Sequence, residues 1–171
     1  MSSQEVGITF PHPQKGIQLG LIFGIILGTF NTVSGYFFAG SVALPSNHLL
    51  DSAAFQAFVP ALSEELLFRG FFFALLVHYL SFDDETKLFS IYWSIALVSI
   101  LFIGVHLIDI DLKTRGWNWK GNLEVLIYLF STTLALAYLR LSTDSIWPCV
   151  ICHSFANSIP FIASLAKNLK N

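Results

Sequence analysis

Long apolar runs separated by short polar stretches dominate the hydrophobic pattern of the chain. Three of these runs contain no Asp, Glu, Lys or Arg: residues 16–50, 88–108 and 145–166. Residues 125–139 form a shorter uncharged run, and residues 53–80 are apolar apart from three charges. Because a helix needs about 20 apolar residues to cross a hydrocarbon core, the pattern predicts about five transmembrane helices in an all-α bundle.

Polar segments set the bounds of these helices. The helices are predicted over about residues 16–38, 51–80, 88–108, 125–140 and 145–166. The longest hydrophilic connection, residues 109–122, precedes the fourth helix. No internal repeat or linker divides the chain, so we expect a single membrane domain over residues 1–171.

The composition supports a multi-pass integral membrane protein. Hydrophobic residues make up 54% of the 171 residues and charged residues only 12%, whereas soluble domains carry about 25% charged residues. The mean hydropathy is +0.66. The net charge is −2 and no basic stripe is interleaved with aromatic residues, so a nucleic-acid partner is not expected.

A stripe of glycines runs along the first predicted helix. Gly20, Gly24 and Gly28 are spaced four residues apart and therefore share one face. Small residues at this spacing let the backbone of a neighbouring helix approach closely. We interpret the stripe as a packing surface rather than a functional site.

Three charges interrupt the second predicted helix. Each costs roughly 2.5 to 3.5 kcal/mol at the bilayer centre, so Glu64, Glu65 and Arg69 require partners. Glu65 and Arg69 are four residues apart and can form an ion pair on one face. Glu64 is rotated from Glu65 by about 100° and is left for another role. The alternative is an ion-paired cluster that only orients helices.

Two other predicted helices carry polar groups that are costly to expose to lipid. His106 follows Phe102 by one turn in the third, and Asn157 follows His153 by one turn in the fifth. A single histidine in an apolar helix is more often a hydrogen-bonded core residue than a ligand. Polar groups on three membrane helices nevertheless have a shared reason to meet, because each avoids lipid by facing the others.

Such a meeting would provide the groups needed to hydrolyse a peptide. A carboxylate can take a proton from water, a histidine can hold the same water, and an imidazole with a carboxamide can stabilise the oxyanion. Glu64, His106 and His153 would also form a zinc ligand set of two imidazoles and one carboxylate. The sequence has no H-E-x-x-H motif.

The predicted depths of His106 and His153 in the membrane differ, which argues against a direct meeting of the two side chains. Counted from one membrane face, His106 lies roughly 27 Å deep and His153 about 12 Å deep. Straight, untilted helices would keep them apart. Helix tilts of about 20° are ordinary, so we expect the helices to be inclined enough for the groups to converge.

Three motifs in order resemble one family. Glu64-Glu65-x-x-x-Arg69, Phe102-x-x-x-His106 and His153-x-x-x-Asn157 are similar to the signatures of the CAAX protease and bacteriocin-processing enzyme family of intramembrane endopeptidases, also called the Abi family. The resemblance covers residues 57–162. Residues 138–148 are also similar to the stretch before the last signature, with Thr143-Asp144 where Thr-Gly is common.

The resemblance implies a role for each motif residue. Glu64 corresponds to the general base and His106 to its partner on the water, while His153 and Asn157 correspond to the oxyanion site. Glu65 and Arg69 correspond to residues that support Glu64 structurally. Phe102 of the second motif is assigned to the same supporting role. Family members have been described both as metalloproteases and as glutamate-dependent enzymes, so a zinc cofactor and a metal-free site both stay open.

The resemblance also bounds the expected partners. The substrate is a membrane-associated protein or peptide, with prenylated CAAX proteins among the candidates, and membrane lipid surrounds the chain. Many members have more membrane helices than this chain, and a homo-oligomer is one way to replace them. Other members act as bacteriocin-immunity or scaffold proteins, so a catalytically silent scaffold or immunity protein is one alternative function. A small transporter, in which Glu64, Arg69 and the histidines form a proton relay, is the other.

Cys149-Val-Ile-Cys-His153 has the spacing of a c-type haem attachment site. We do not expect haem, because the motif lies within an uncharged apolar helix and Met1 is the sole methionine to serve as an axial ligand. Two small thiols packed between helices are the simpler interpretation.

Overall fold

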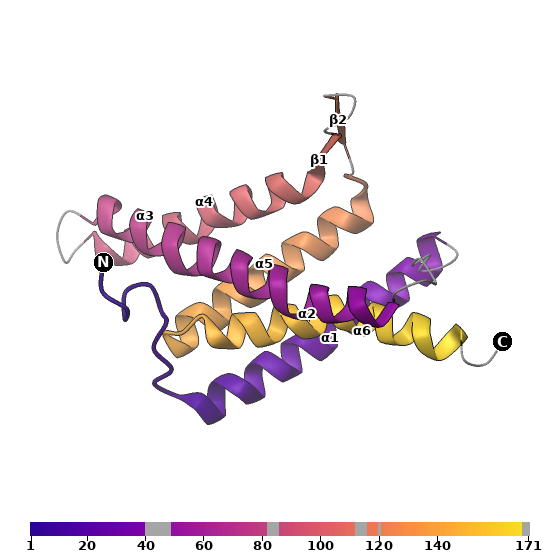
Figure 1. The fold of residues 1–171 in the computed structure, drawn as a ribbon. Helices are drawn as coiled ribbons and strands as arrows, with labels where there is room; N and C mark the ends of the chain where they lie inside the picture. The colour runs from indigo at the N-terminus through magenta and orange to yellow at the C-terminus, as the bar shows by residue number, and fades with distance from the viewer. Residues whose placement is uncertain (40–48, 82–85, 112–115, 120, 169–171) are drawn as a thin grey trace.

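The computed structural model describes residues 1–39, 49–81, 86–111, 116–119 and 121–168. Its helices, drawn in Figure 1, are α1 (Pro13–Ala39), α2 (Leu49–Glu65), the π-helix η1 (Leu66–Phe72), α3 (Phe73–Leu80), α4 (Lys87–Leu107), α5 (Leu123–Thr143) and α6 (Trp147–Asn168). Because α2, η1 and α3 follow one another without a break, they form one rod. The described residues thus form five helical rods, which confirms the predicted all-α bundle.

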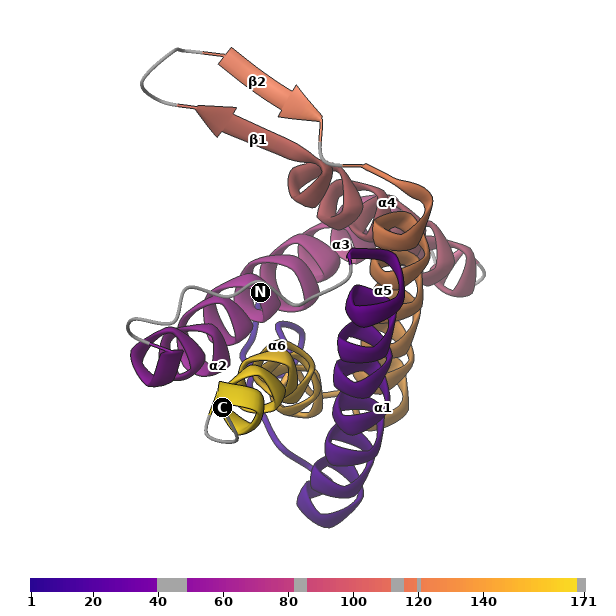
Figure 2. The same cartoon turned by 90° about the vertical axis from the view of Figure 1, so that its right-hand side faces the viewer.

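The rods are inclined to one another around α6. Helix α1 packs against α6 and α5, α2 packs against α6 on another side, and α3 pairs with α4 (Figures 1 and 2). Two short antiparallel strands, β1 (Ile108–Asp111) and β2 (Gly116–Trp119), project beyond the bundle with Ile108 opposite Trp119. This hairpin lies in the segment that the sequence predicted only as a hydrophilic connection.

Local chemistry explains where α5 and α6 begin and end. The Asn122 side chain accepts a hydrogen bond from the Val125 backbone N–H at 2.8 Å, as an N-cap does. Asp144 ends α5 in the left-handed conformation, with φ 51° and ψ 29°. Glycine is favoured in this conformation after a helix. This explains why the family commonly has Thr-Gly where this chain has Thr143-Asp144. Pro148 is in the first turn of α6, where proline is tolerated.

The glycine stripe of α1 packs against α6, as predicted. A Cβ on Gly24 would lie 2.7 Å from the Phe155 Cβ and 2.8 Å from the Cys152 carbonyl oxygen. A Cβ on Gly20 would lie 2.8 Å from the Pro148 carbonyl oxygen. These distances are too short for any real Cβ, so the absence of side chains lets the two backbones come together.

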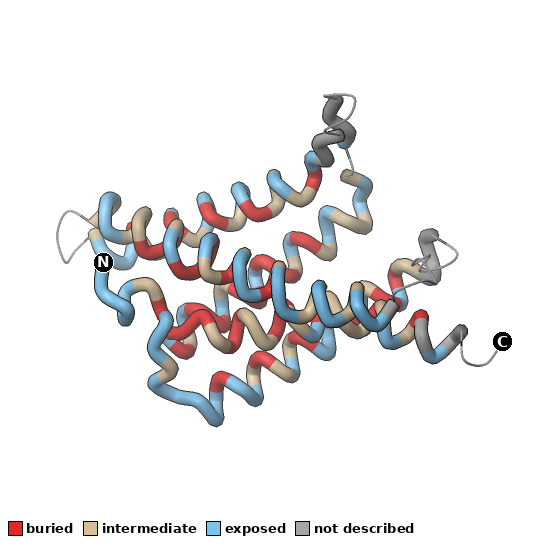
Figure 3. The backbone as a smooth tube through the Cα atoms, in the orientation of Figure 1, coloured by how far each residue is buried: buried red, intermediate tan, exposed pale blue. Residues whose placement is uncertain are grey.

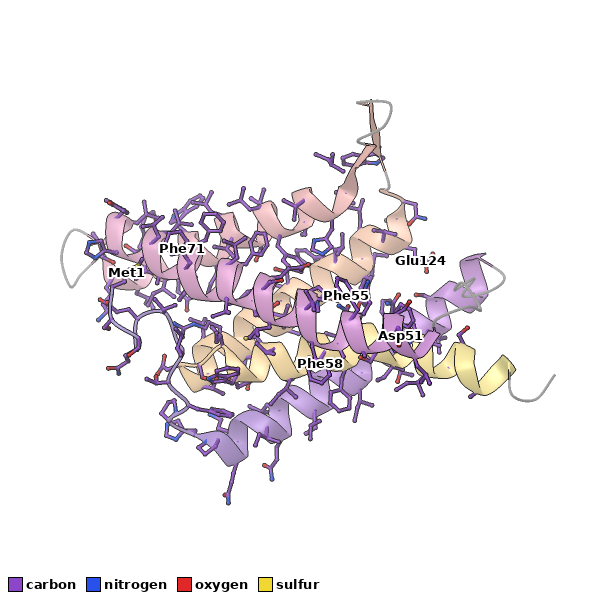
Figure 4. The ribbon with its side chains drawn as sticks, viewed as in Figure 1. Met1, Asp51, Phe55, Phe58, Phe71 and Glu124 are labelled. Carbon is purple, nitrogen blue, oxygen red and sulfur yellow. The ribbon has the colours of Figure 1, made fainter. Side chains whose placement is uncertain are left out.

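Polar and apolar side chains are distributed as expected for a membrane protein. Figure 3 shows the buried residues on the inward faces of the rods. The buried set includes Glu65, Arg69, Ser90, Ser94, Thr132, Thr133, Arg140, Thr143 and His153. Large apolar side chains are exposed instead, among them Phe55, Phe58 and Phe71, labelled on the α2–α3 rod in Figure 4. Lipid is the medium that makes this arrangement favourable.

Three of the described helices are long and apolar enough to cross a membrane. They contain the spans Pro13–Gly35, Lys87–Leu107 and Leu123–Thr143. The α2–α3 rod carries the charged residues of the first motif and α6 carries His153 and Asn157 of the third, whereas the second motif lies on the spanning helix α4. The sequence prediction of a membrane-embedded helical protein is therefore supported by three of the rods.

Candidate active site

A π-helical segment begins directly after the glutamate pair. Glu65 is the last residue of α2, and η1 then runs from Leu66 to Phe72, with the Phe73 backbone N–H bonded to the Phe68 carbonyl oxygen. The wider turn changes the register of the rod and buries Arg69. Such π-bulges occur frequently at functional sites. The sequence analysis predicted one regular helix here and missed this change of register.

Glu65 lies at the centre of a buried polar cluster. Its Oε1 is 3.5 Å from the Arg69 Nη1 and 2.8 Å from the His153 Nδ1. The Glu65 side chain is fully buried, and 4% of the Arg69 side chain is exposed. The structure therefore contains the Glu65–Arg69 pair expected from their spacing. It adds a bond to α6 that spacing alone does not reveal.

Glu64 points away from Glu65 and faces both site histidines. Its Oε2 is 3.4 Å from the His106 Nε2 and 4.0 Å from the His153 Nε2. Straight helices would place the two histidines at different depths. The rods are inclined to one another (Figures 1 and 2), so His106 and His153 can both reach Glu64. Three of the four residues assigned to catalysis, Glu64, His106 and His153, thus meet at one point.

The second ring nitrogen of each histidine is held by another group. The His106 Nδ1 lies 2.8 Å from the Phe102 carbonyl oxygen. A carbonyl oxygen only accepts hydrogen bonds, so Nδ1 carries a proton and Nε2 is directed at Glu64. On the opposite side, the Glu65 carboxylate holds the His153 Nδ1, which leaves its Nε2 facing Glu64.

Phe102 packs under the polar groups, as its position in the motif predicted. It is 1% exposed, and its ring centroid lies 4.3 Å from that of His106 and 6.2 Å from that of His153. The guanidinium carbon of Arg69 lies 4.1 Å from the centre of the same ring. A single aromatic ring therefore lies close to a cation and to both imidazoles.

Asn157 lies one turn after His153 but bonds elsewhere. Its Nδ2 donates a hydrogen bond to the Gln56 carbonyl oxygen of α2 at 3.5 Å, the long limit for such a bond. Among the contacts of the described residues, none joins Asn157 to Glu64, His106 or His153. The structure brings Asn157 to the α2–α6 interface beside the site, with its amide turned to the backbone.

Access to water differs between the two carboxylates. The Glu64 and His106 side chains are 28% and 30% exposed, whereas His153 is 6% exposed and Glu65 is closed off. The Oε2 atom of Glu64 is itself buried and has no hydrogen-bond partner among the described residues. A buried carboxylate oxygen aimed between two imidazoles can accept a proton from a small polar reactant that reaches it.

Two side chains that the sequence analysis missed extend the cluster. The Arg69 Nη2 donates to the Thr133 Oγ1 at 3.0 Å, and Thr133 in turn donates to the Ser99 Oγ at 3.1 Å. Their sequence signal is weak, because Ser and Thr are common packing residues in membrane helices. They connect the site to α5 and α4, and Thr133 gives the Arg69 guanidinium a hydrogen-bond acceptor in addition to Glu65.

The cysteines pack in the core, as their interpretation as small buried thiols predicted. Cys149 and Cys152 are free, fully buried and part of an apolar cluster with Leu136 and Leu139. Within the described ranges, no group of three or more His, Cys, Asp or Glu side chains is arranged to hold a metal ion. A zinc ion held by Glu64, His106 and His153 and a metal-free site both remain untested predictions.

An apolar cavity adjoins the polar cluster. It has a volume of about 780 Å³ and is lined by residues of α1, α2 and α6, among them Phe58, Leu62, Ile151, Ser154 and Phe155. Leu62 precedes Glu64 on α2, and Ser154 follows His153 on α6. The cavity therefore reaches the turns of both helices that carry the site.

Comparison with known proteins identified one family. The family model described as type II CAAX prenyl endopeptidase Rce1-like matches residues 46–159, more than half of the chain. This range contains all three motifs. No curated protein and no solved structure matched the chain.

Proposed function

Since the chain belongs to the type II CAAX prenyl endopeptidase Rce1-like family, as the motifs predicted, we propose that it is a multi-pass intramembrane endopeptidase whose Glu64 activates water. The observation that carries this proposal is the convergence of His106 and His153 on one Glu64 oxygen, at 3.4 and 4.0 Å. The family establishes the protease class. The roles of individual residues and the substrate are our proposal.

The proposed reaction starts with a water molecule bound beside the Glu64 Oε2 and the His106 Nε2. Glu64 Oε2 takes one proton from the water, and the water oxygen attacks the carbonyl carbon of the scissile peptide bond at the same time. The proton then passes from Glu64 to the leaving amide nitrogen as the C–N bond breaks. The products are a carboxylic acid and an amine, and Glu64 returns to its starting state.

His153 and Asn157 stabilise the oxyanion in this proposal. When both His153 ring nitrogens carry protons, Nδ1 donates to Glu65 and Nε2 is left to donate to the oxyanion. Glu65 bonds both His153 and Arg69, and these two contacts keep the His153 imidazole oriented towards Glu64. Asn157 joins by exchanging its long bond to Gln56 for one to the oxyanion.

We further propose that the substrate is a prenylated protein or peptide. The matched family is described as one of prenyl endopeptidases, and the apolar cavity beside the site has room for an isoprenoid chain, at about 780 Å³. Its lining is almost entirely hydrocarbon, which suits a prenyl group and not a polar side chain. The peptide attached to that group would lie next to Glu64.

The test is Glu64→Gln in the full chain, reconstituted in lipid nanodiscs with a quenched-fluorescence peptide that carries a farnesylated cysteine. Loss of the general base should lower kcat by about 10²- to 10⁴-fold, while the melting temperature stays near that of the wild type. Glu124→Gln is the matched control, because Glu124 lies at the start of α5, outside the polar cluster. A Glu64→Gln variant with wild-type cleavage contradicts the proposal.

Treatment with a chelator distinguishes a metal-free mechanism from a zinc-dependent one. We expect cleavage to persist after EDTA treatment and dialysis, because the proposed steps use only protein groups and water. Loss of activity that zinc alone restores would replace this mechanism with a metal-dependent one at the same site. If no prenylated peptide is cleaved while wild type and variants fold alike, the scaffold function takes precedence.

A further inference from the structure

Residues 2–8, here called the N-terminal strap, lie against the end of the bundle where α5 connects to α6. Backbone carbonyls of the strap accept three hydrogen bonds from that end: Glu5 from the Arg140 Nη2 at 2.9 Å, Gly7 from the Ile146 backbone N–H at 2.9 Å, and Ile8 from the Trp147 Nε1 at 2.7 Å. The strap precedes residues 46–159, the range that the family model matches. The strap is therefore bonded to the matched part of the chain at three defined positions, Arg140, Ile146 and Trp147.

Arg140 joins this strap to the π-helix. Its guanidinium is buried, and its Nε donates to the Arg69 carbonyl oxygen at 3.1 Å, while Nη2 holds Glu5. The guanidinium carbon also lies 5.2 Å from the centre of the Phe73 ring, just past the end of η1. One side chain thus contacts both Arg69 and the residue that follows the π-turn.

The strap approaches Arg140 so closely that only glycine fits at one position. Gly7 has a φ of +76°, and a Cβ there would lie 2.8 Å from the Arg140 Cζ. On the other side, a Cβ on Gly70 of η1 would lie 3.2 Å from the Val6 Cγ1. The strap therefore packs on both the arginine and the π-helix that the arginine holds.

We propose that Arg140 is a positioning residue, held by the strap, that sets the place of the π-turn and through it the catalytic cluster. The path is continuous: Arg140 bonds the Arg69 backbone, the Arg69 side chain pairs with Glu65, and Glu65 bonds His153. A small displacement of the turn would misplace the His153 Nε2, which the proposed reaction needs. The inference rests on the proposed function, because it assigns His153 a part in the reaction.

The test compares Gly7→Ala, Arg140→Gln and Arg140→Lys in the full chain with the farnesylated peptide. Misplacement of about 1 Å can reduce a rate about 100-fold, so we expect each variant to lower kcat about 10- to 100-fold with little change in KM. Arg140→Lys should not rescue, because one ammonium cannot reproduce the planar fork that reaches two carbonyls. Gly104→Ala is the matched control, since a Cβ at Gly104 meets nothing within 4 Å.

Two further measurements separate positioning from a simple tether. In the double variant Gly7→Ala/Arg140→Gln, kcat should be no lower than in Arg140→Gln alone, because both changes act through one contact. The His153 imidazole resonance, assigned with His153→Gln in isotope-labelled protein, should move in Gly7→Ala and Arg140→Gln. If Arg140→Gln does not fold, Gly7→Ala keeps the guanidinium and carries the test.

A lower melting temperature with wild-type kcat and an unmoved His153 resonance would overturn the inference and leave the strap as a tether. The resonance does not depend on cleavage. If the wild type cleaves no peptide, the proposed function fails, and the His153 signal by itself still shows whether the strap and Arg140 position the cluster.

Discussion

The two sides of α6 are built on opposite principles. Towards α1, Cys152 and Phe155 meet the glycine stripe, and the contact is apolar and so close that a Cβ on Gly24 would lie 2.7 Å from Phe155. Towards the α2–α3 rod, His153 bonds the buried Glu65 at 2.8 Å and faces Glu64. Adjacent residues on one helix, Cys152 and His153, therefore belong to a packing interface and to the candidate active site, respectively.

This difference shows how a small membrane protein can hold costly polar groups in place. Lipid gives apolar helices no hydrophobic reason to associate, so close backbone packing must fix α6 on one side. Once α6 is fixed, His153 has a defined distance to the carboxylates on its other side. The glycine interface provides close packing, and the polar interface holds the groups of the proposed reaction.

Among changes to the two sides of α6, the largest expected effect comes from removing the imidazole on the polar side. We expect His153→Gln to reduce kcat by about 10²- to 10³-fold, because it removes a donor to the oxyanion. Cys152→Ala, one residue away on the packing side, should lower the free energy of unfolding by about 1 kcal/mol with kcat unchanged. Cleavage assays and thermal unfolding in nanodiscs measure the two effects. Equal losses of kcat in both variants would mean that the two sides are not distinct.

A smaller effect should follow from filling the packing side. Gly24→Ala places a Cβ against backbone atoms of α6, which forces the helices apart and should cost about 1 to 3 kcal/mol of stability. Gly104→Ala has open space and a better helix former, so we expect a stability equal to or above that of the wild type. Thermal unfolding of both variants measures the difference. Similar melting temperatures would contradict the close α1–α6 contact.

The smallest effect concerns the turn that leads into α6. Asp144 has a φ of 51°, a conformation that costs residues with a Cβ roughly 1 kcal/mol or more. We expect Asp144→Ala to be about 1 kcal/mol less stable than Asp144→Gly, because glycine adopts this conformation without strain and Asp tolerates it better than Ala. Unfolding curves of the two variants provide the measurement. The reverse order would show that the turn does not depend on the backbone conformation of this residue.

Much of the fold and of the site could be predicted from particular residues. The uncharged runs predicted the five rods, and the spacing of Glu65 and Arg69 predicted their ion pair. The π-helix was not predictable, because Leu66–Phe72 is as apolar as the helices around it. The hairpin before α5 was missed as well, since its segment reads as a polar connection. From the sequence, Arg140 is only a charged residue near the end of a predicted helix. Its contacts in the structure reveal the link to the site.

By itself, the sequence determined the membrane character, the order of the rods, the family and the residues that must find polar partners. These follow from composition and local spacing, because transfer into lipid acts on each residue separately. Only the tertiary structure decided that His106 and His153 reach the same Glu64 oxygen and that Glu65 bonds His153 rather than Arg69 alone. The inclination of the rods, the π-turn and the close α1–α6 contact set those distances, and each depends on residues far apart in the chain.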